Sequence, residues 1–166
     1  MNSAHLNLTL RRASKSDSKA LLDWRNDATT RAFSLSSEEI TREQHRVWLK
    51  KTLQDSSCLL IIGEINCEPV GMTRINILKD SSLGQVSINL NPDFRGMGIS
   101  RQLLKESLLL GVESLGNISR YLAEIHVDNA ASRKIFESIG FVKGHESQSE
   151  SFENYSLDSE FLVVSQ

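Results

Sequence analysis

The stretch 95–100, which reads RGMGIS, has the residue types of a loop that binds phosphate. Gly96 and Gly98 lie between a strand pattern that ends at Pro92 and a leucine-rich helical pattern. The first amides of a helix have no partner inside the helix, and the helix dipole adds partial positive charge there. Glycine also lets the main chain approach a bulky anion closely. The stretch therefore predicts either a pyrophosphate site at a helix N-terminus or a tight strand-to-helix turn.

Two better-known glycine motifs do not fit this stretch. The dinucleotide fingerprint G-x-G-x-x-G needs a third glycine and an acidic residue about twenty positions on, and no third glycine follows Gly98 at that spacing. The phosphate loop of nucleotide triphosphatases needs a Gly-Lys-Ser/Thr sequence, which is absent. Any anion bound here would be held mainly by main-chain amides.

The composition of the chain excludes several classes of function. The 166 residues suit one domain spanning 1–166, and a formal net charge of −2 argues against a nucleic-acid partner. Cys58 and Cys67 lie in or beside apolar runs, so we expect two small buried side chains and no metal site. The N-terminus lacks a signal-peptide pattern, and no apolar run is long enough for a membrane span. We expect a cytoplasmic protein without a membrane partner.

Hydrophobic periodicity predicts an α+β chain with seven strands and about four helices. In the helix expected at 36–53, Ile40, Gln44, Val47 and Trp48 should share one side. Short connections among the three consecutive strands after the second helix favour an antiparallel meander, and the strand–helix–strand unit 82–127 favours a right-handed parallel crossover. The elements are expected, in order, as strand 5–13, helix 14–27, helix 36–53, two strands within 58–78, strand 82–91, helix 98–115, strand 120–127, helix 129–140, and a hairpin of 141–145 and 152–157 around a polar loop at 146–151.

Two motifs resemble the GNAT N-acetyltransferase superfamily. NPDFRGMGISRQLL is similar to its acetyl-coenzyme A signature, [RQ]-x-x-G-x-[GA], which runs here from Arg95 to Ser100. VDNAASRKIFESIGF resembles the helix N-x-x-S-x-x-x-[YF]-x-x-x-G-F, which runs from Asn129 to Phe141. The predicted element order is also that of the family. The resemblance covers about residues 6–141 and implies the acyl-CoA N-acyltransferase fold, with a mixed seven-stranded sheet whose fourth and fifth strands splay apart.

The resemblance implies that acetyl-CoA is the co-substrate. Its pantetheine arm would lie in the splay, and a main-chain N–H at Leu90 would serve as the oxyanion donor. Arg133 and Lys134 are candidates for the 3′-phosphate, or else form a solvated helix face. The residues assigned to acetyl-CoA in this way are Ile88, Asn89, Leu90, Arg95, Gly96, Met97, Gly98, Ile99, Ser100, Arg101, Asn129, Ser132, Arg133 and Phe136.

Three residues depart from the family pattern. Ser100 replaces the usual glycine or alanine, but serine is small and its hydroxyl can donate to phosphate. Phe136 stands where many members carry a tyrosine that protonates the leaving thiolate. A thiol with a pKa near 8.5 leaves readily without that proton. Gln85 stands where related sequences often place a glutamate that acts as the general base, and glutamine cannot take up a proton.

The group that removes the amine proton is left open among four candidates. Glu124 and His126 share one face of the predicted strand 120–127, whereas Ile125 points the other way. His45 on the second helix is the third candidate, because a histidine pKa suits general base catalysis near neutral pH. A chain of water molecules, without a dedicated side chain, is the fourth.

The acceptor side resembles the subgroup that acetylates nucleotide-linked amino sugars, as in the pseudaminic acid pathway. The sequences LLDWRND and REQHRVWL carry this resemblance. Arg25, Asn26, His45 and Gln85 are the residues expected to line the acceptor site. The Arg25 guanidinium would donate two hydrogen bonds to a phosphate group of the acceptor.

Two other functions remain open. A ribosomal-protein or peptide N-terminal acetyltransferase shares this layout, but the acidic residues that a basic peptide needs are scattered. A silent acyl-CoA-binding module would bind acetyl-CoA without releasing CoA to any amine. The expected partners are acetyl-CoA and a small amine, for a monomer or a homodimer.

Overall fold

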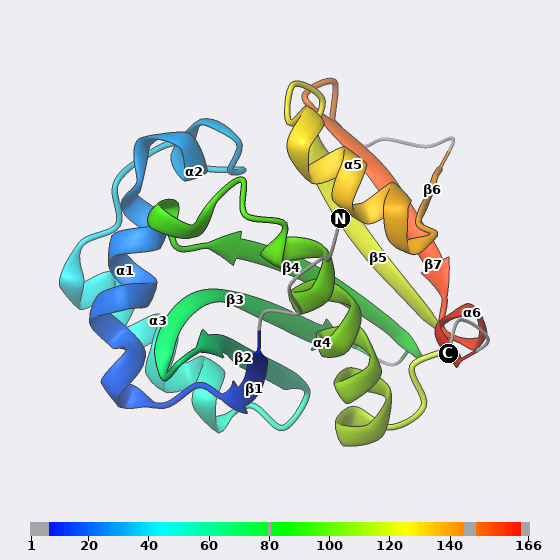
Figure 1. Cartoon of the computed structure of the whole chain (residues 1–166), viewed down its shortest axis with the longest axis horizontal. Coiled ribbons are helices and arrows are strands. Elements are labelled where there is room, and N and C mark those ends of the chain that lie inside the picture. Colours follow the sequence, from blue (N-terminus) through cyan, green and yellow to red (C-terminus); the bar gives the residue numbers. More distant parts are fainter. Residues whose placement is uncertain (1–6, 80, 145–148, 164–166) are drawn as a thin grey trace.

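The computed structural model describes residues 7–79, 81–144 and 149–163, and its centre is one seven-stranded sheet (Figure 1). The strand order is β1-β2-β3-β4-β5-β7-β6, with β4 and β5 parallel and the other neighbours antiparallel. The strands are β1 (Leu8–Arg12), β2 (Cys58–Ile65), β3 (Glu68–Ile77), β4 (Leu83–Leu90), β5 (Arg120–His126), β6 (Val142–Lys143) and β7 (Phe152–Asp158). The predicted α+β class, mixed sheet and parallel β4–β5 pair are confirmed.

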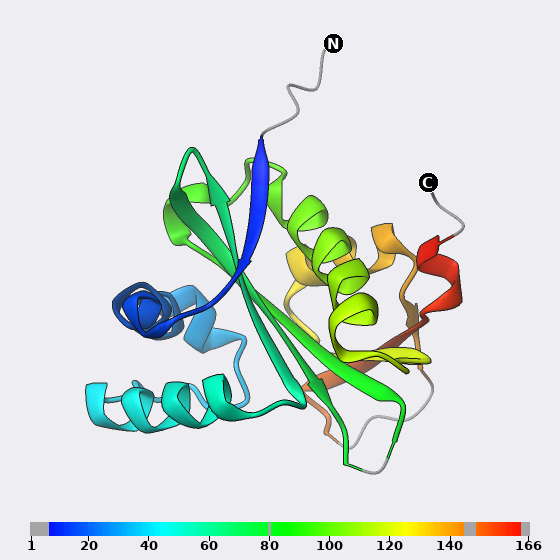
Figure 2. The same cartoon turned by 90° about the horizontal axis from the view of Figure 1, so that it is seen from below.

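Six α-helices cover the sheet within the described ranges. They are α1 (Ser18–Asn26), α2 (Ala28–Ala32), α3 (Arg42–Gln54), α4 (Ile99–Leu115), α5 (Ala130–Ile139) and α6 (Glu160–Val163). The four longest are the predicted helices, and the short α2 and α6 were not predicted. Figure 2 shows α1 and α3 on one side of the sheet and α4 on the other. None of the helices in the described part of the chain is long and apolar enough to cross a membrane.

Strand β2 explains why helices pack on both faces of the sheet. Its apolar run alternates between the faces, because successive strand side chains point in opposite directions. Leu59 and Ile61 join the core under α4, whereas Leu60 and Ile62 pack with Trp24 of α1 and its neighbours. All four β2 side chains are buried. The strand is therefore shared between two hydrophobic cores.

The predicted second helix begins six residues too early. Thr41 is the N-cap of α3: its Oγ1 accepts the Gln44 N–H at 3.2 Å, and the Gln44 Oε1 accepts the Thr41 N–H at 2.8 Å. This reciprocal capping box satisfies two amides that would otherwise lack partners. It starts the helix after Thr41 and leaves residues 36–41 outside the helix.

Two apolar side chains, Val47 and Cys67, are exposed to solvent. Val47 is 58% exposed, because α3 turns His45 and Leu49 toward the sheet instead. Cys67 is exposed in the turn between β2 and β3, where its φ is +64°, whereas Cys58 is buried as predicted. Their free thiols therefore lie in different environments.

The C-terminal hairpin is confirmed only in part. Strands β6 and β7 pair antiparallel as predicted, but β7 also pairs with β5 along its whole length. Residue 145 of the predicted strand 141–145 and the first half of the predicted polar loop, residues 146–148, lie outside the described residues.

An ion pair anchors the start of α1 to the sheet edge. The two terminal nitrogens of Arg11 donate to the two carboxylate oxygens of Asp17, each at 2.8 Å, and the Ser14 N–H donates to Asp17 at 2.7 Å. The Asp17 side chain is 5% exposed and that of Arg11 is 37% exposed. Replacing Asp17 by Asn should lower the free energy of unfolding by about 2 kcal/mol, between the values for exposed and buried pairs. The melting temperature, measured by circular dichroism, should then fall by about 4 to 8 °C.

The matched control is Glu43→Gln, which breaks a two-pronged pair with Arg46 on the exposed surface of α3. This change should leave the melting temperature within about 1 °C of the wild-type value.

The Arg11 hydrogen bond holds the pKa of Asp17 below its usual value. The stabilisation is thus present above the unfolded-state pKa and is lost as pH falls through the folded-state pKa. The difference between wild type and Asp17→Asn should shrink below about pH 4. If Asp17→Asn and Glu43→Gln lowered the melting temperature equally, the stabilisation assigned to the buried Asp17 would be wrong.

Candidate functional site

The site begins where β4 and β5 separate. The two strands are paired only from Leu83 to Gln85, where Gln85 lies opposite Leu122. Beyond that point β4 continues to Leu90 and β5 to His126 without pairing to each other. Figure 1 shows the two strands diverging toward α2 and α5. The predicted splay is therefore present.

The main chain of β4 points polar groups into this splay. The Asn91 N–H donates to the Val70 carbonyl at 2.9 Å, and β3 and β4 keep this antiparallel register. Since main-chain direction alternates along a strand, Asn89 also faces β3, whereas the N–H groups of Ile88 and Leu90 face away from it. This orientation suits the predicted role of Leu90 as an oxyanion donor.

The glycine loop presents open main chain at the start of α4. Gly96 and Gly98 have φ values of +78° and +77°, and Gly98 is the N-cap of the 17-residue helix. A Cβ placed on either glycine would meet no atom within 4 Å. Met97 between them is 53% exposed. The loop therefore has the space and the free amides that a pyrophosphate group requires.

Helix α5 closes the other side of the splay. The Asn129 side chain caps the helix and accepts the Ser132 N–H at 3.0 Å. Phe136 is buried, and its ring meets that of Phe141 edge to face at 4.9 Å. The cap presents the start of α5 to the splay, and Phe136 forms part of the apolar wall.

Two predicted cofactor arginines are engaged elsewhere. Arg133 donates to the Val127 carbonyl at 3.2 Å, and its Nη1 lies 3.8 Å from a carboxylate oxygen of Glu153. Arg101 donates to the Ser138 carbonyl at 3.4 Å, which ties α4 to α5. Neither lines the cavity described below. Contact with the 3′-phosphate remains a prediction for Arg133 that would require its side chain to leave these partners.

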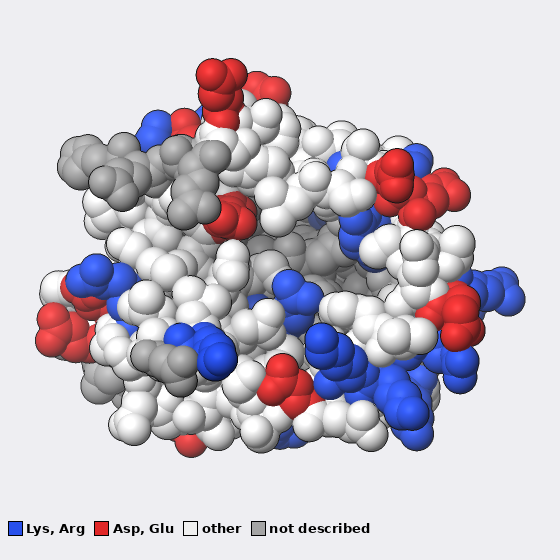
Figure 3. Space-filling model, turned by 180° about the vertical axis from the view of Figure 1, so that it is seen from behind, with Lys and Arg blue, Asp and Glu red and all other residues white. Residues whose placement is uncertain are grey.

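One cavity of about 1010 Å³ joins the splay to the face covered by α1, α2 and α3. Figure 3 shows the molecule hollowed near its centre, with basic side chains beside the opening. The predicted site residues that line this cavity are Arg25, His45, Gln85, Ile88, Asn89, Leu90, Arg95, Gly96, Ser100, Glu124, His126, Asn129, Ser132 and Phe136. The predicted site residues that do not line it are Asn26, Met97, Gly98, Ile99, Arg101 and Arg133.

Asn26 has a structural contact in place of the expected acceptor contact. Its side-chain amide donates to the Ile40 carbonyl at 2.8 Å, and its oxygen accepts the Ile40 N–H at 2.9 Å. Both ends of the side chain are thus used to hold the segment 33–41 against α1.

The acceptor half of the cavity contains two cationic side chains. Arg25 donates from Nη2 to the Ser36 carbonyl at 2.8 Å, but its buried Nη1 has no partner among the described residues. Burial, with Arg31 nearby, lowers the pKa of Arg25, although a guanidinium stays charged. Arg74 lies over the Trp48 ring, 5.9 Å from its centre. Sequence reasoning missed Arg74, although alternation along its strand could have placed it on this face.

His45 is a neutral hydrogen-bond acceptor in the cavity wall. The residue is 3% exposed, and burial lowers the pKa of its imidazole despite a hydrogen bond to the Ser18 main chain. The Nε2 atom is buried without a partner in the part of the chain that the structure describes. Taking up a proton here would create a charge in a site shielded from water. His45 is therefore better suited to accept a hydrogen bond than to act as the base.

Glu124 and His126 share the cavity side of β5, as predicted, because Ile125 is buried in the core on the opposite face. The His126 Nδ1 accepts the Asp128 N–H at 3.2 Å, so the neutral ring carries its proton on Nε2. Glu124 is exposed, and Gln85 Nε2 lies 3.5 Å from its Oε2. Of the three side-chain candidates, Glu124 is the one with acceptor atoms open to both cavity and solvent.

No tyrosine lines the cavity. The Tyr121 hydroxyl donates to the Leu108 carbonyl at 2.7 Å, and the Tyr155 hydroxyl donates to Glu153 at 3.1 Å. Burial raises the pKa of both hydroxyls. The chain contains two tyrosines in all. Neither therefore replaces the acid that Phe136 lacks.

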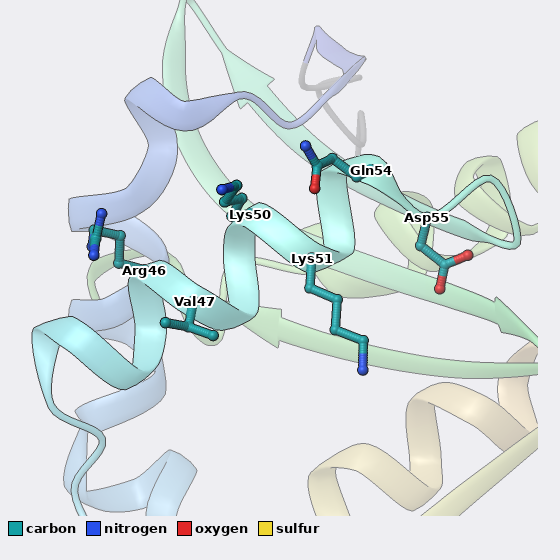
Figure 4. A pocket seen from close by; sticks show the side chains of 6 residues that line it. All are labelled: Arg46, Val47, Lys50, Lys51, Gln54 and Asp55. Atoms are coloured by element: carbon teal, nitrogen blue, oxygen red, sulfur yellow. The ribbon is translucent and has the colours of Figure 1, made fainter.

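A second hollow lies on the outer face of α3. It measures about 550 Å³ and is lined by Arg46, Val47, Lys50, Lys51, Gln54 and Asp55. Figure 4 shows that these side chains come from α3 and the residue after it. No second element faces them within this lining, so the cavity at the splay is the candidate active site.

The sequence matches one known family. The model of the acetyltransferase (GNAT) domain family matches residues 7–142, whereas no curated protein sequence matches the chain. The matched region covers most of the 166 residues. The chain therefore belongs to the acetyltransferase (GNAT) family, as the sequence predicted, and is an N-acetyltransferase that uses acetyl-CoA.

Solved structures share the fold at low sequence identity. A spermidine N-acetyltransferase from Vibrio cholerae, in complex with CoA and spermine, has a TM-score of 0.85 at 17% identity, covering 94% of this chain and 98% of that one. RimL, a ribosomal L7/L12 alpha-N-protein acetyltransferase in complex with coenzyme A, has a TM-score of 0.75 at 21% identity, covering 91% and 93%. An N-acetyltransferase from Staphylococcus aureus Mu50 has a TM-score of 0.73 at 21% identity, covering 92% and 99%. At these identities the likeness concerns the fold.

Proposed function

We propose that this enzyme acetylates the primary amine of a small anionic acceptor, specifically a nucleotide-linked amino sugar. The observation that carries the proposal is Arg25, whose buried Nη1 lacks a partner within the described chain and which lines the acceptor half of the cavity. Burying an N–H of a cation without a hydrogen-bond acceptor costs free energy. A phosphate oxygen can accept from this N–H in a charge-assisted hydrogen bond. Arg74 adds a second positive charge on the same wall.

His45 and Trp48 suit the rest of such an acceptor. The centres of their rings lie 5.3 Å apart, and both residues line the cavity. The unpartnered Nε2 of His45 can accept a hydrogen bond from a hydroxyl or an amine. Trp48 provides a flat apolar face, which suits a sugar or base ring.

The residues of the cavity support direct attack by the amine. Acetyl-CoA, when bound, supplies an activated thioester. The Leu90 N–H donates to the developing oxyanion, while Glu124 takes the amine proton directly or through one water molecule. A carbon–nitrogen bond forms and the carbon–sulfur bond breaks, and the sulfur leaves as thiolate because no tyrosine lines the cavity. Holding the two substrates together in one cavity supplies much of the remaining rate increase.

A polyamine acceptor is the competing function, since a spermidine N-acetyltransferase shares the fold. Glu38, Glu39 and Glu124 also line the cavity, and polyamines bind carboxylates. Glu39 is 68% exposed, however, and already lies 3.7 Å from Arg31. Arg25 and Arg74 would repel a polycation, so the anionic acceptor is favoured.

A screen for CoA release tests the proposal. Purified enzyme and acetyl-CoA are incubated with nucleotide-linked amino sugars, the corresponding free amino sugars, spermidine and N-terminal peptides. CoA release should be fastest with a nucleotide-linked amino sugar. If CoA were released only with spermidine or only with a peptide, the proposed acceptor would be wrong. If acetyl-CoA bound but no CoA were released with any of these amines, the protein would be a silent acyl-CoA-binding module.

Arg25→Met tests the anion contact within that screen. The acceptor KM should rise about 10- to 100-fold, the loss expected for a hydrogen bond to a charged group. The KM for a free amino sugar, which has no phosphate, should not change. Arg46→Met removes an exposed arginine of α3 and serves as the control. An equal loss with phosphorylated and free sugars would contradict the assigned role of Arg25.

A further inference from the structure

Helix α2 lies at the cavity without a hydrophobic anchor of its own. It has five residues, none of them buried, and a helix this short is not stable alone. Even so, residues of α2 and of the segment 33–40 form one wall of the cavity. Contacts from outside the helix must therefore hold this wall in place.

A cluster of polar side chains supplies these contacts. Asp27 is the N-cap of α2 and accepts the Thr30 N–H at 3.0 Å. Arg95 reaches over from the glycine loop: its Nη1 lies 2.8 Å from the Asp27 carboxylate, and its Nη2 donates to the Thr30 hydroxyl at 2.9 Å. That hydroxyl donates in turn to the Asn89 side chain at 3.1 Å. The glycine loop, the end of β4 and the start of α2 are thus joined.

The geometry uses the forked shape of arginine. Two different nitrogens of Arg95 contact two different residues, both of which belong to the start of α2. The Arg95 and Asp27 side chains are 31% and 22% exposed, so water screens the pair only in part. A lysine would keep the charge but could not make both contacts in this arrangement.

We propose that Asp27, Thr30 and Arg95 are positioning residues that couple the acetyl-CoA loop to the acceptor wall. Ordering of the loop at residues 95–100 fixes Arg95, and Arg95 fixes α2 and the segment 33–40 after it. Occupation of the loop then favours acceptor binding, and the reverse holds by thermodynamic reciprocity. The inference rests on the proposed function only in that the second substrate is an amine.

Asp27→Asn is the sharpest test, because asparagine caps a helix as well as aspartate but carries no charge. We expect the acceptor KM to rise at least about fivefold, the lower range of coupling between sites. The acetyl-CoA Kd, measured by calorimetry without acceptor, should change less than about twofold. The control is Asp23→Asn on α1, which removes an exposed ion pair with Lys19 and should change neither value.

Variants of Arg95 complete a double-mutant cycle with Asp27→Asn. Arg95→Gln should raise the acceptor KM as Asp27→Asn does, and the double variant should be no worse than either single one. Arg95→Lys should fail to restore the wild-type KM. If Arg95→Gln weakens acetyl-CoA binding while Asp27→Asn leaves the acceptor KM unchanged, Arg95 is a phosphate ligand and the proposal is wrong.

Hydrogen exchange decides the question even if no amine is acetylated. Acetyl-CoA should slow amide exchange in residues 28–40 of the wild type, because the ordered loop holds α2 in place. The same addition should have little effect on these residues in Asp27→Asn. Equal slowing in both proteins would overturn the coupling, whereas the proposed function would fail separately in the screen for CoA release.

Discussion

Gly98→Pro is expected to abolish acetyl-CoA binding. Gly98 has a φ of +77°, whereas proline is restricted to about −65°, so the loop cannot keep its conformation. The substitution also removes one main-chain amide of the glycine loop. Isothermal calorimetry should show an affinity at least about 100-fold weaker, the loss expected for two or more charge-assisted hydrogen bonds.

Gly116→Pro is the matched control for this change. Gly116 lies at the other end of α4, also has a positive φ of +61°, and also has no atom within 4 Å of a Cβ. It should destabilise the protein through the lost hydrogen bond from its N–H to Val112, but leave the acetyl-CoA Kd unchanged. If Gly98→Pro does not fold, Gly98→Ala should still weaken binding relative to Gly116→Ala. Equal acetyl-CoA affinity in that pair would rule out the glycine loop as the phosphate site.

Glu124→Gln should lower kcat by about 100-fold at neutral pH, the smaller end of the range for general base catalysis. Glutamine keeps the size and one hydrogen-bonding oxygen of the side chain but cannot take up a proton. The acceptor KM should change only a few-fold, because the proposed acceptor contacts are made by Arg25, His45 and Arg74. Initial rates of CoA release at saturating acetyl-CoA provide the measurement.

His126→Phe is the control for Glu124→Gln. Phe33 and Phe152 pack against the His126 ring with centres 5.6 and 5.1 Å away, and phenylalanine should preserve this packing. We expect kcat to remain within about threefold of the wild type. If His126→Phe lowered kcat strongly and Glu124→Gln lowered it only slightly, His126 and not Glu124 would be the general base. If both variants lowered kcat only slightly, proton removal through a chain of water molecules would be favoured.

The donor half of the site could be predicted because its geometry is local. A glycine pattern after a strand and before a helix specifies where free amides occur, and Gly96 and Gly98 have the expected left-handed conformations. The splay followed from the family resemblance and is seen in the three residue pairs between β4 and β5. Whether each named residue contacts acetyl-CoA stays a prediction.

The acceptor half was harder because its contacts join distant parts of the chain. Arg95 was expected to bind the cofactor, but its partner Asp27 lies 68 positions earlier, and no local pattern connects them. Asn26 was expected in the acceptor site for its polarity, yet that polarity serves the main chain of Ile40. Residue type alone does not distinguish a side chain that holds a loop from one that holds a ligand.

The separation of β4 from β5 creates a sheet edge inside the molecule. The N–H groups of Ile88 and Leu90 face away from β3, toward the cavity and not toward bulk solvent. Exposed edges are hazardous because another chain can pair with them and aggregate. Here residues of β5, α2 and α5 line the cavity that the edge faces, which shields the edge from pairing with another chain. A thin linear molecule with its own amide groups can pair with the edge, which combines ligand selection with protection against aggregation.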